Sequence, residues 1–136
     1  MEVLTSRLGY LLKHAQLRLG ALVEAATEPH GLGGRELAVL AVLAEGRPLS
    51  QLEAAERLGV DRTTMVALLD ALEAKGVVER RRSPEDRRRN IVELTPGGRD
   101  RFHSAETARA AAEREFLAAL TPAESTELLR LLRLTL

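Results

Sequence analysis

The chain has 136 residues, of which 45% are hydrophobic and only 2% aromatic, and its formal net charge is zero. This length supports one modest domain, whose core must be built from leucine, alanine and valine. The absence of cysteine excludes a disulfide framework, a thiolate metal site and a redox-sensing thiol, and the lack of a long apolar run or secretion signal indicates a cytoplasmic protein without a membrane partner.

The N-terminal segment, from Val3 to about Ala26, has the periodicity of one long amphipathic helix. Its apolar stripe recurs at three- and four-residue steps, at Leu4, Leu8, Leu11, Leu12, Ala15, Leu19, Leu22 and Ala26. On a terminal helix, the partner that buries such a stripe can be a second subunit. Residues 28–34 are predicted to form a loop because they are rich in proline and glycine, and residues 35–45 a second helix that Gly46 ends.

Two short helices across a tight turn are predicted between Ser50 and Gly76. Ser50 to Glu53 has the S-x-x-E pattern of a capping box, and a helix with Leu52, Ala55 and Leu58 on its apolar side then runs to Gly59. Asp61 is a good N-cap for the next helix, residues 62–75, and Val60 is expected to be buried in the corner between the two. This arrangement is typical of a helix-turn-helix.

A basic hairpin is predicted directly after these helices. Residues 77–80 and 90–94 are rich in β-branched side chains, and residues 81–89 form a polar loop marked by proline. Six arginines gather here against two acids: Arg80, Arg81, Arg82, Arg87, Arg88 and Arg89. A helix-turn-helix followed by such a hairpin is a winged helix, and a local basic patch indicates a nucleic-acid surface even at zero net charge.

The C-terminal part is predicted to be two helices. Thr95 and Pro96 supply a cap and a first-turn proline for a helix from about Gly97 to Leu120, and Thr121 starts a last, leucine-rich helix over residues 123–134. The terminal helices carry more apolar surface than a small winged helix can cover, so association through the termini is expected. The predicted fold class is mainly α with a small β-hairpin wing. Its three regions are 1–28 (dimerisation helix), 32–98 (winged helix-turn-helix) and 99–136 (dimerisation helices).

Three segments together carry a family resemblance. They are S-Q-x-x-x-A-x-x-L-G-V-D-R-T-T-M from Ser50, L-x-A-L-E-A-K-G-V-V-E-R from Leu69, and D-R-R-R-N-I-V-x-L-T-P-G-G from Asp86. The chain resembles the MarR family of bacterial transcription regulators, densely from Ser50 to about Arg101. The resemblance implies homodimers joined by their first and last helices, a short wing strand at Leu49, and a near-palindromic double-stranded DNA operator. It also implies a repressor that a small ligand relieves.

The expected DNA-contacting residues lie at the two helices and the wing. They are Ser50, Gln51, Arg62, Thr63, Thr64, Val66, Ala67, Arg82, Asp86, Arg87, Arg88 and Arg89. Arg62 can make a bidentate contact to guanine, and the threonines can contact bases or phosphates. The alternative is that Arg62 and Thr63 only position the protein on the DNA backbone. Val66, Ala67 and Ala71 stand where the family often has polar or basic residues, which predicts fewer polar contacts and apolar contact with thymine methyls instead.

In the wing, the resemblance assigns Asp86 and Arg88 to a pair in which the aspartate orients an arginine that enters the minor groove. A narrow minor groove attracts arginine through its enhanced negative potential. The alternative interpretation of these arginines is a solvated run of charges.

Ligand and enzyme chemistry have weaker signals. The three histidines have no metal-ligand spacing, and surface or structural histidines are one interpretation of them. The other is a pocket for a small aromatic or anionic ligand at Tyr10, His14, Arg18 and His30, although so few aromatics make a poor stacking site. No nucleophile, phosphate-loop or zinc-protease motif is present, so neither an enzyme nor a cofactor is expected. A winged helix used for protein contact remains the alternative function.

Overall fold

The computed structural model describes residues 2–136; Met1 lies outside this range. The helices and strands, in chain order, are α1 (Glu2–Thr5), α2 (Leu8–Thr27), the 3-10 helix η1 (Glu28–His30), α3 (Gly34–Leu43), β1 (Leu49–Ser50), α4 (Gln51–Leu58), α5 (Arg62–Ala74), β2 (Val78–Arg82), β3 (Asn90–Leu94), α6 (Pro96–Phe116) and α7 (Pro122–Leu134). This order confirms the predicted fold class, a mainly helical chain with a small wing. Within residues 2–136, no helix combines the length and apolar character needed to cross a membrane.

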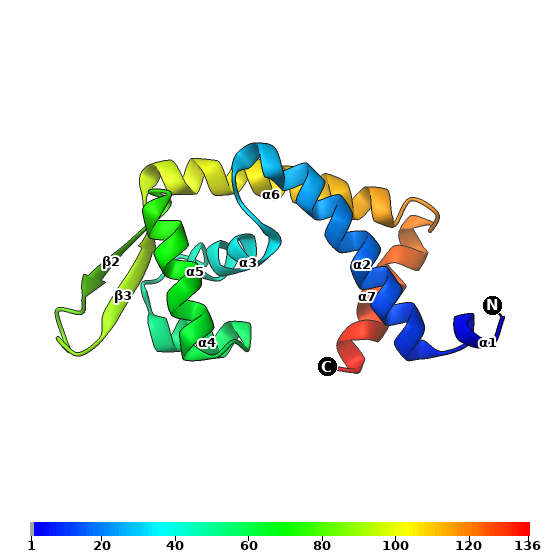
Figure 1. The fold of residues 1–136 in the computed structure, drawn as a ribbon, viewed down its shortest axis with the longest axis horizontal. Helices are drawn as coiled ribbons and strands as arrows, with labels where there is room; N and C mark the ends of the chain where they lie inside the picture. The colour runs from blue at the N-terminus through cyan, green and yellow to red at the C-terminus, as the bar shows by residue number, and fades with distance from the viewer. Residues whose placement is uncertain (1) are drawn as a thin grey trace.

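The molecule has two parts joined by one long helix (Figure 1). The winged helix, from α3 to β3, lies at one end, and α1, the first half of α2 and α7 form an arm at the other, where both chain termini lie. Helix α6 extends across both parts, and α2 packs along it. The site on the winged helix is therefore held at a distance from the arm by the paired helices α2 and α6.

The core lies almost wholly in the winged helix and the first turns of α6. Its largest fully buried side chains include Leu37, Leu40, Leu49, Met65, Leu69, Leu72, Val77 and Val92. Burying one such leucine stabilises the fold by roughly 2 kcal/mol. The arm is different, because neither α1 nor α7 contains a buried residue. The apolar surface that the periodicity predicted at the termini is thus left uncovered in a single chain.

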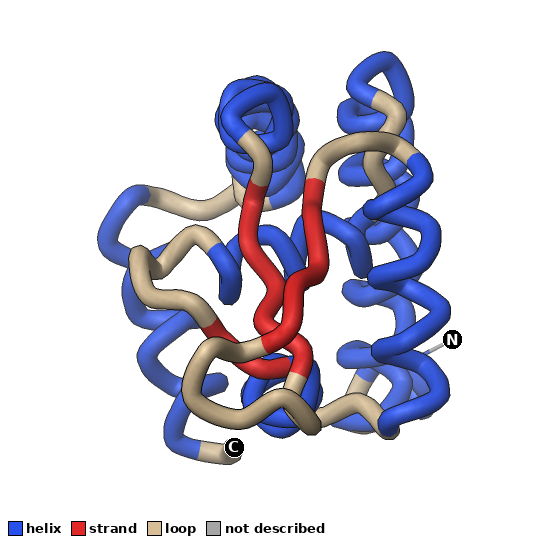
Figure 2. The backbone as a smooth tube through the Cα atoms, turned by 90° about the vertical axis from the view of Figure 1, so that its left-hand side faces the viewer, coloured by secondary structure: helices blue, strands red, loops and turns tan. Residues whose placement is uncertain are grey.

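The wing is a three-stranded antiparallel sheet with strand order β1-β3-β2 (Figure 2). Strand β1 is two residues long, and Leu49 pairs with Val92 on β3. The first wing strand was predicted at 77–80 but runs from Val78 to Arg82, because its pairing with β3 continues to Arg82 opposite Asn90; Val77 precedes the strand and accepts a hydrogen bond from Thr95 N at 3.1 Å. Two arginines that were expected in the loop, Arg81 and Arg82, are therefore part of the ladder.

Several helix bounds differ from those predicted. The long N-terminal helix is broken at Ser6 and Arg7: the Ser6 hydroxyl donates to Val3 O at 2.9 Å, and Arg7 is extended. Hydroxyl groups that bond back to the main chain compete with helix continuation in this way. Residues 28–30, expected as loop, form η1, and α3 begins at Gly34 and ends at Leu43, before the expected 45.

Helix α6 also differs from its prediction at both ends. It includes both glycines of its first turn, because the Thr95 hydroxyl accepts from Gly98 N at 2.9 Å. It ends at Phe116 rather than Leu120, where Leu120 N instead donates to Leu117 O in a tight turn.

Candidate nucleic-acid interface

Helix α4 begins the site. Its N-cap Ser50 accepts from Glu53 N at 3.1 Å, as the S-x-x-E pattern predicted, and hydrogen bonding to Ser50 holds the pKa of Glu53 below its ordinary value. Gly59 ends the helix at a φ of 66°, in the left-handed region that favours glycine. Two expectations fail here. Val60 is only half-buried, and Leu52 is 57% exposed because it faces away from the core.

Helix α5 presents its first turns outward. Asp61 accepts from Thr64 N at 2.6 Å, and this hydrogen bond lowers the pKa of the Asp61 carboxyl. Met65, Leu69 and Leu72 are buried against the core. The predicted contact residues divide by exposure: Arg62, Thr63 and Ala67 are exposed, and Thr64 and Val66 are half-buried. A cation, a hydroxyl and a methyl group are thus available to a ligand that meets this end of the helix.

Arg80 does not belong to the free cationic surface of the wing. Its guanidinium donates to Asp70 and to Glu73 on α5, the latter at 3.1 Å, and to Gln51 Oε1 at 3.4 Å. These carboxylates raise the pKa of Arg80, and the pKa of Glu73 is lowered in return. Arg81 is likewise paired with Glu93 across the sheet, at 2.6 Å. The expected patch of six arginines is therefore reduced to four.

The other four arginines, Arg82, Arg87, Arg88 and Arg89, are exposed. Their loop is ordered by Ser83, which is nearly buried and accepts from Glu85 N and Asp86 N, each at 3.3 Å.

Asp86 shapes the tip of the wing. Its Oδ1 accepts from Arg88 N at 3.0 Å, whereas Arg88 Nε lies 3.7 Å away. The Arg88 side chain is 95% exposed. Asp86 therefore fixes the backbone from which Arg88 projects more firmly than it fixes the guanidinium itself.

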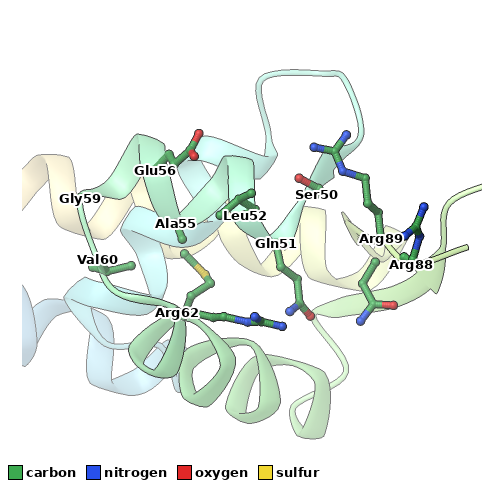
Figure 3. A pocket seen from close by; sticks show the side chains of 12 residues that line it. Ser50, Gln51, Leu52, Ala55, Glu56, Gly59, Val60, Arg62, Arg88 and Arg89 are labelled. Carbon is green, nitrogen blue, oxygen red and sulfur yellow. The ribbon is translucent and has the colours of Figure 1, made fainter. Parts of the chain in front are cut away.

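One hollow joins these parts (Figure 3). It has a volume of about 390 Å³ and is lined by Ser50, Gln51, Leu52, Ala55, Glu56, Gly59, Val60, Arg62, Met65, Arg88, Arg89 and Asn90. In Figure 3, Arg62 extends from the start of α5 toward Gln51, and Arg88 and Arg89 lie on the wing beyond them. The structure thus brings together five of the predicted residues from three separate segments.

Sequence patterns did not single out the other seven lining residues as contacts, and Leu52 and Asn90 are among them. Leu52 had been taken for core because it shares helical spacing with Ala55 and Leu58, and spacing does not say which side of so short a helix is covered. Asn90 follows directly after three arginines, and that position was the only signal for it.

The residues proposed for a small ligand do not form one group. Tyr10 and His14 are in ring contact, with centroids 4.1 Å apart, and the guanidinium of Arg18 lies 5.3 Å from the centre of the Phe116 ring. His30 lies past the far end of α2, more than about 13 Å along the helix axis from Arg18. It lines a separate hollow of about 490 Å³ with Glu28, Pro29, Gly31, Asp100, Arg101 and Ser104.

Among the described residues, 2–136, no three side chains of His, Asp or Glu gather as ligands for an ion.

Comparison with known proteins agrees with this geometry. The family model described as MarR family matches residues 30–89. The HTH-type transcriptional repressor Rv2887 of Mycobacterium tuberculosis is 35% identical over 125 residues, which cover 92% of this chain and 90% of that protein.

Two solved structures are similar over nearly the whole chain. The transcriptional repressor CouR, bound to a 23-mer DNA duplex, is 36% identical with a TM-score of 0.92 and covers 97% of this chain and 94% of its own. The PcaV regulator of Streptomyces coelicolor, in complex with its natural ligand, is 26% identical with a TM-score of 0.87 and covers 97% and 93%. With the fold, the winged helix and these relatives in agreement, the chain belongs to the MarR family of winged helix-turn-helix transcriptional regulators, DNA-binding proteins that are not enzymes.

Proposed function

We propose that this regulator is a homodimeric repressor that binds a near-palindromic operator in the cytoplasm and is released by a small aromatic or anionic ligand. The observation that carries the proposal is the shared hollow, because it joins Arg62 at the start of the recognition helix α5 to Arg88 and Arg89 of the wing. Arginines on two elements that line one hollow can contact neighbouring grooves of a DNA duplex, whose phosphates are negatively charged.

In this proposal, α5 enters the major groove and the wing reaches the minor groove. Arg62, Thr63 and Thr64 contact base edges or phosphates, and Val66 and Ala67 offer apolar contact to thymine methyls. The other proposed DNA contacts are Ser50, Gln51, Arg82, Asp86, Arg87, Arg88 and Arg89. The 95% exposure of Arg88 supports its place at the minor groove, since nothing in the chain has to move before it can enter.

The homodimer is supported by the uncovered arm. Leu8, Leu12, Leu131 and Leu134 are between 45% and 73% exposed, and α7 is a leucine-rich helix without a buried residue. An unpartnered apolar face of this kind marks an association surface. A second copy would cover it and place two winged helices side by side, so that two half-sites are read about one turn of DNA apart. Regions 1–28 and 99–136 would then serve dimerisation and 32–98 DNA binding.

Relief by a ligand is supported by the similarity to PcaV, which was solved with its natural ligand. Tyr10, His14 and Arg18 lie on successive turns of α2 and form the candidate ligand-binding group. His30 is not part of it, because it lines the separate hollow. A ligand held by this group at the arm would favour a different spacing of the two recognition helices. Because both half-sites must be met at once, a changed spacing lowers the affinity for DNA.

The experiment that tests the proposal is selection of bound duplexes from a random DNA pool, run in parallel with wild-type protein and with Arg88→Ala. We expect the wild type to enrich a near-palindrome. Arg88→Ala should enrich the same sequence less strongly. The selected duplex then serves as the probe for release by aromatic carboxylates.

No enrichment above background would contradict sequence-specific binding. That result would favour the protein-contact alternative, in which the leucine-rich arm is the surface that binds a protein partner. Enrichment that Arg88→Ala leaves unchanged would remove Arg88 from the interface while keeping the repressor.

A further inference from the structure

The C-terminal end of the recognition helix α5 is tied to the connector between α2 and α3. Lys75, which caps this end, donates from Nζ to Gly31 O at 2.9 Å and to both carboxylate oxygens of Glu36 at 2.8 and 2.9 Å. Glu36 also accepts from Gly33 N at 3.0 Å, so the same carboxylate caps α3. One ammonium group thus joins the recognition helix to two segments that precede it in the chain.

A second cation completes this junction from the opposite side. Arg101 on α6 donates from Nε to His30 O at 2.7 Å and from Nη1 to Lys75 O at 3.4 Å. Its guanidinium lies directly over Gly31, where an added side-chain carbon would be only 2.3 Å from Arg101 Nη2. The planar fork of arginine presents its donors in a fixed geometry, and here it reaches two carbonyl groups on separate segments at once.

This junction lies where the paired helices α2 and α6 meet the winged helix. Gly31 continues from α2 through η1, α6 extends into the arm, and Lys75 ends the helix that enters the DNA groove. A change in the angle between α2 and α6 therefore reaches the recognition helix through Arg101 and Lys75. Neither residue lines the hollow of the DNA interface, so their effect on DNA has to be indirect.

We infer that Arg101 is a positioning residue, which with Lys75 sets the direction of the recognition helix relative to the arm and hence the spacing of the two half-sites that the dimer accepts. The inference rests on the homodimer of the proposed function. Arg101 is half-buried beside the open hollow that His30 also lines. Water can therefore fill the space that a smaller side chain leaves, and no empty cavity forms in the core.

The test uses duplexes that carry two copies of the selected half-site, with spacers that differ by one base pair, and a duplex with a single half-site. Wild-type protein is compared with Arg101→Ala, Arg101→Lys and Lys75→Met, and with Arg99→Ala as the control. Arg99 is exposed on α6 two residues away, so Arg99→Ala removes the same charge without the junction. Circular dichroism and sedimentation confirm that each variant is folded and dimeric.

We expect wild type and Arg99→Ala to share one sharp spacer optimum. Arg101→Ala and Lys75→Met should flatten that optimum: the affinity for the duplex with the best spacer should fall about tenfold, whereas the affinity for the single half-site should be retained. Arg101→Lys should resemble Arg101→Ala, since it restores the charge but not the fork.

Two outcomes would overturn the inference. Equal losses on the single and the double site would mean that the junction serves stability only, and an unchanged spacer profile would mean that Arg101 positions nothing. A wild type without any spacer optimum is a different result, because it would contradict the homodimeric reader itself.

Discussion

Arg80 on β2 donates through Nη2 to Oδ1 of Asp70 on α5, so the base of the wing is tied to the outer side of the recognition helix. Glu73, one turn further along α5, accepts from the same guanidinium. The wing and the recognition helix are thereby joined by side-chain contacts in the absence of DNA.

Replacing Arg80 with Met should lower the free energy of unfolding by about 1 kcal/mol, because a three-member ion-pair network is lost and two carboxylates remain next to each other. Urea denaturation measures this loss. The matched control is Arg82→Met on the same strand, which should leave stability unchanged and weaken DNA binding, since Arg82 is exposed. If Arg82→Met destabilised the protein as much as Arg80→Met, the network would not be the cause.

Arg62→Ala should relax sequence discrimination rather than only weaken binding. A bidentate contact from arginine to guanine discriminates by about 1–3 kcal/mol against the wrong base. Competition between the selected duplex and versions with each base changed in turn would measure it. A uniform loss for every duplex, with a salt slope smaller by about one unit, would instead place Arg62 on a phosphate.

Gly98→Ala should destabilise the fold by about 1–3 kcal/mol through overpacking. A side-chain carbon at Gly98 would lie 2.0 Å from Val77 O, which is backbone and cannot rotate away. The neighbouring Gly97→Ala is the control: nothing lies within 4 Å of its added carbon, so the higher helix propensity of alanine should stabilise by up to about 1 kcal/mol. Thermal unfolding of the two variants should shift in opposite directions, and a shared direction would refute the close approach.

Stability should fall in acid partly because of Asp61. Its pKa is lowered in the folded protein from an ordinary 3.8, so its contribution is complete above that value and fades as the pH falls through the lower folded-state pKa. Asp61→Asn keeps an acceptor for Thr64 N but cannot titrate. The free energy of unfolding, measured between about pH 2 and pH 6, should therefore depend less on pH in Asp61→Asn. Parallel curves for wild type and variant would contradict this assignment.

Leu12→Glu and Leu131→Glu should each convert the dimer to a monomer, because a charge would enter the apolar face that a second copy covers. Both leucines are more than 40% exposed in the single chain, so the fold of the protomer should survive. Sedimentation equilibrium measures the association. Leu17→Glu is the control, since Leu17 lies on the opposite side of α2 from Leu8 by helical spacing. Dimers that persist in both variants would place the interface elsewhere.

The sequence by itself determined the local structure and the family. Helix caps act over three residues, so Ser50, Asp61, Thr95 and Thr121 could be identified from their neighbours and each caps a helix as predicted. Periodicity likewise placed the core side of α5 and the uncovered leucines of the arm.

Only the tertiary structure decided which charges are free. Arg80 and Arg82 are indistinguishable in a basic run and share one face of β2, but only Arg80 contacts Asp70 on α5, whereas Arg82 is exposed at the end of the strand. The junction of Arg101, His30 and Lys75 joins residues 26 and 71 positions apart, and no local pattern reports such contacts. Short-range hydrogen bonds depend on residues that are neighbours in the chain, whereas the pairing of distant charges depends on how the helices and strands pack. For this reason the sequence alone overestimated the number of free arginines in the wing.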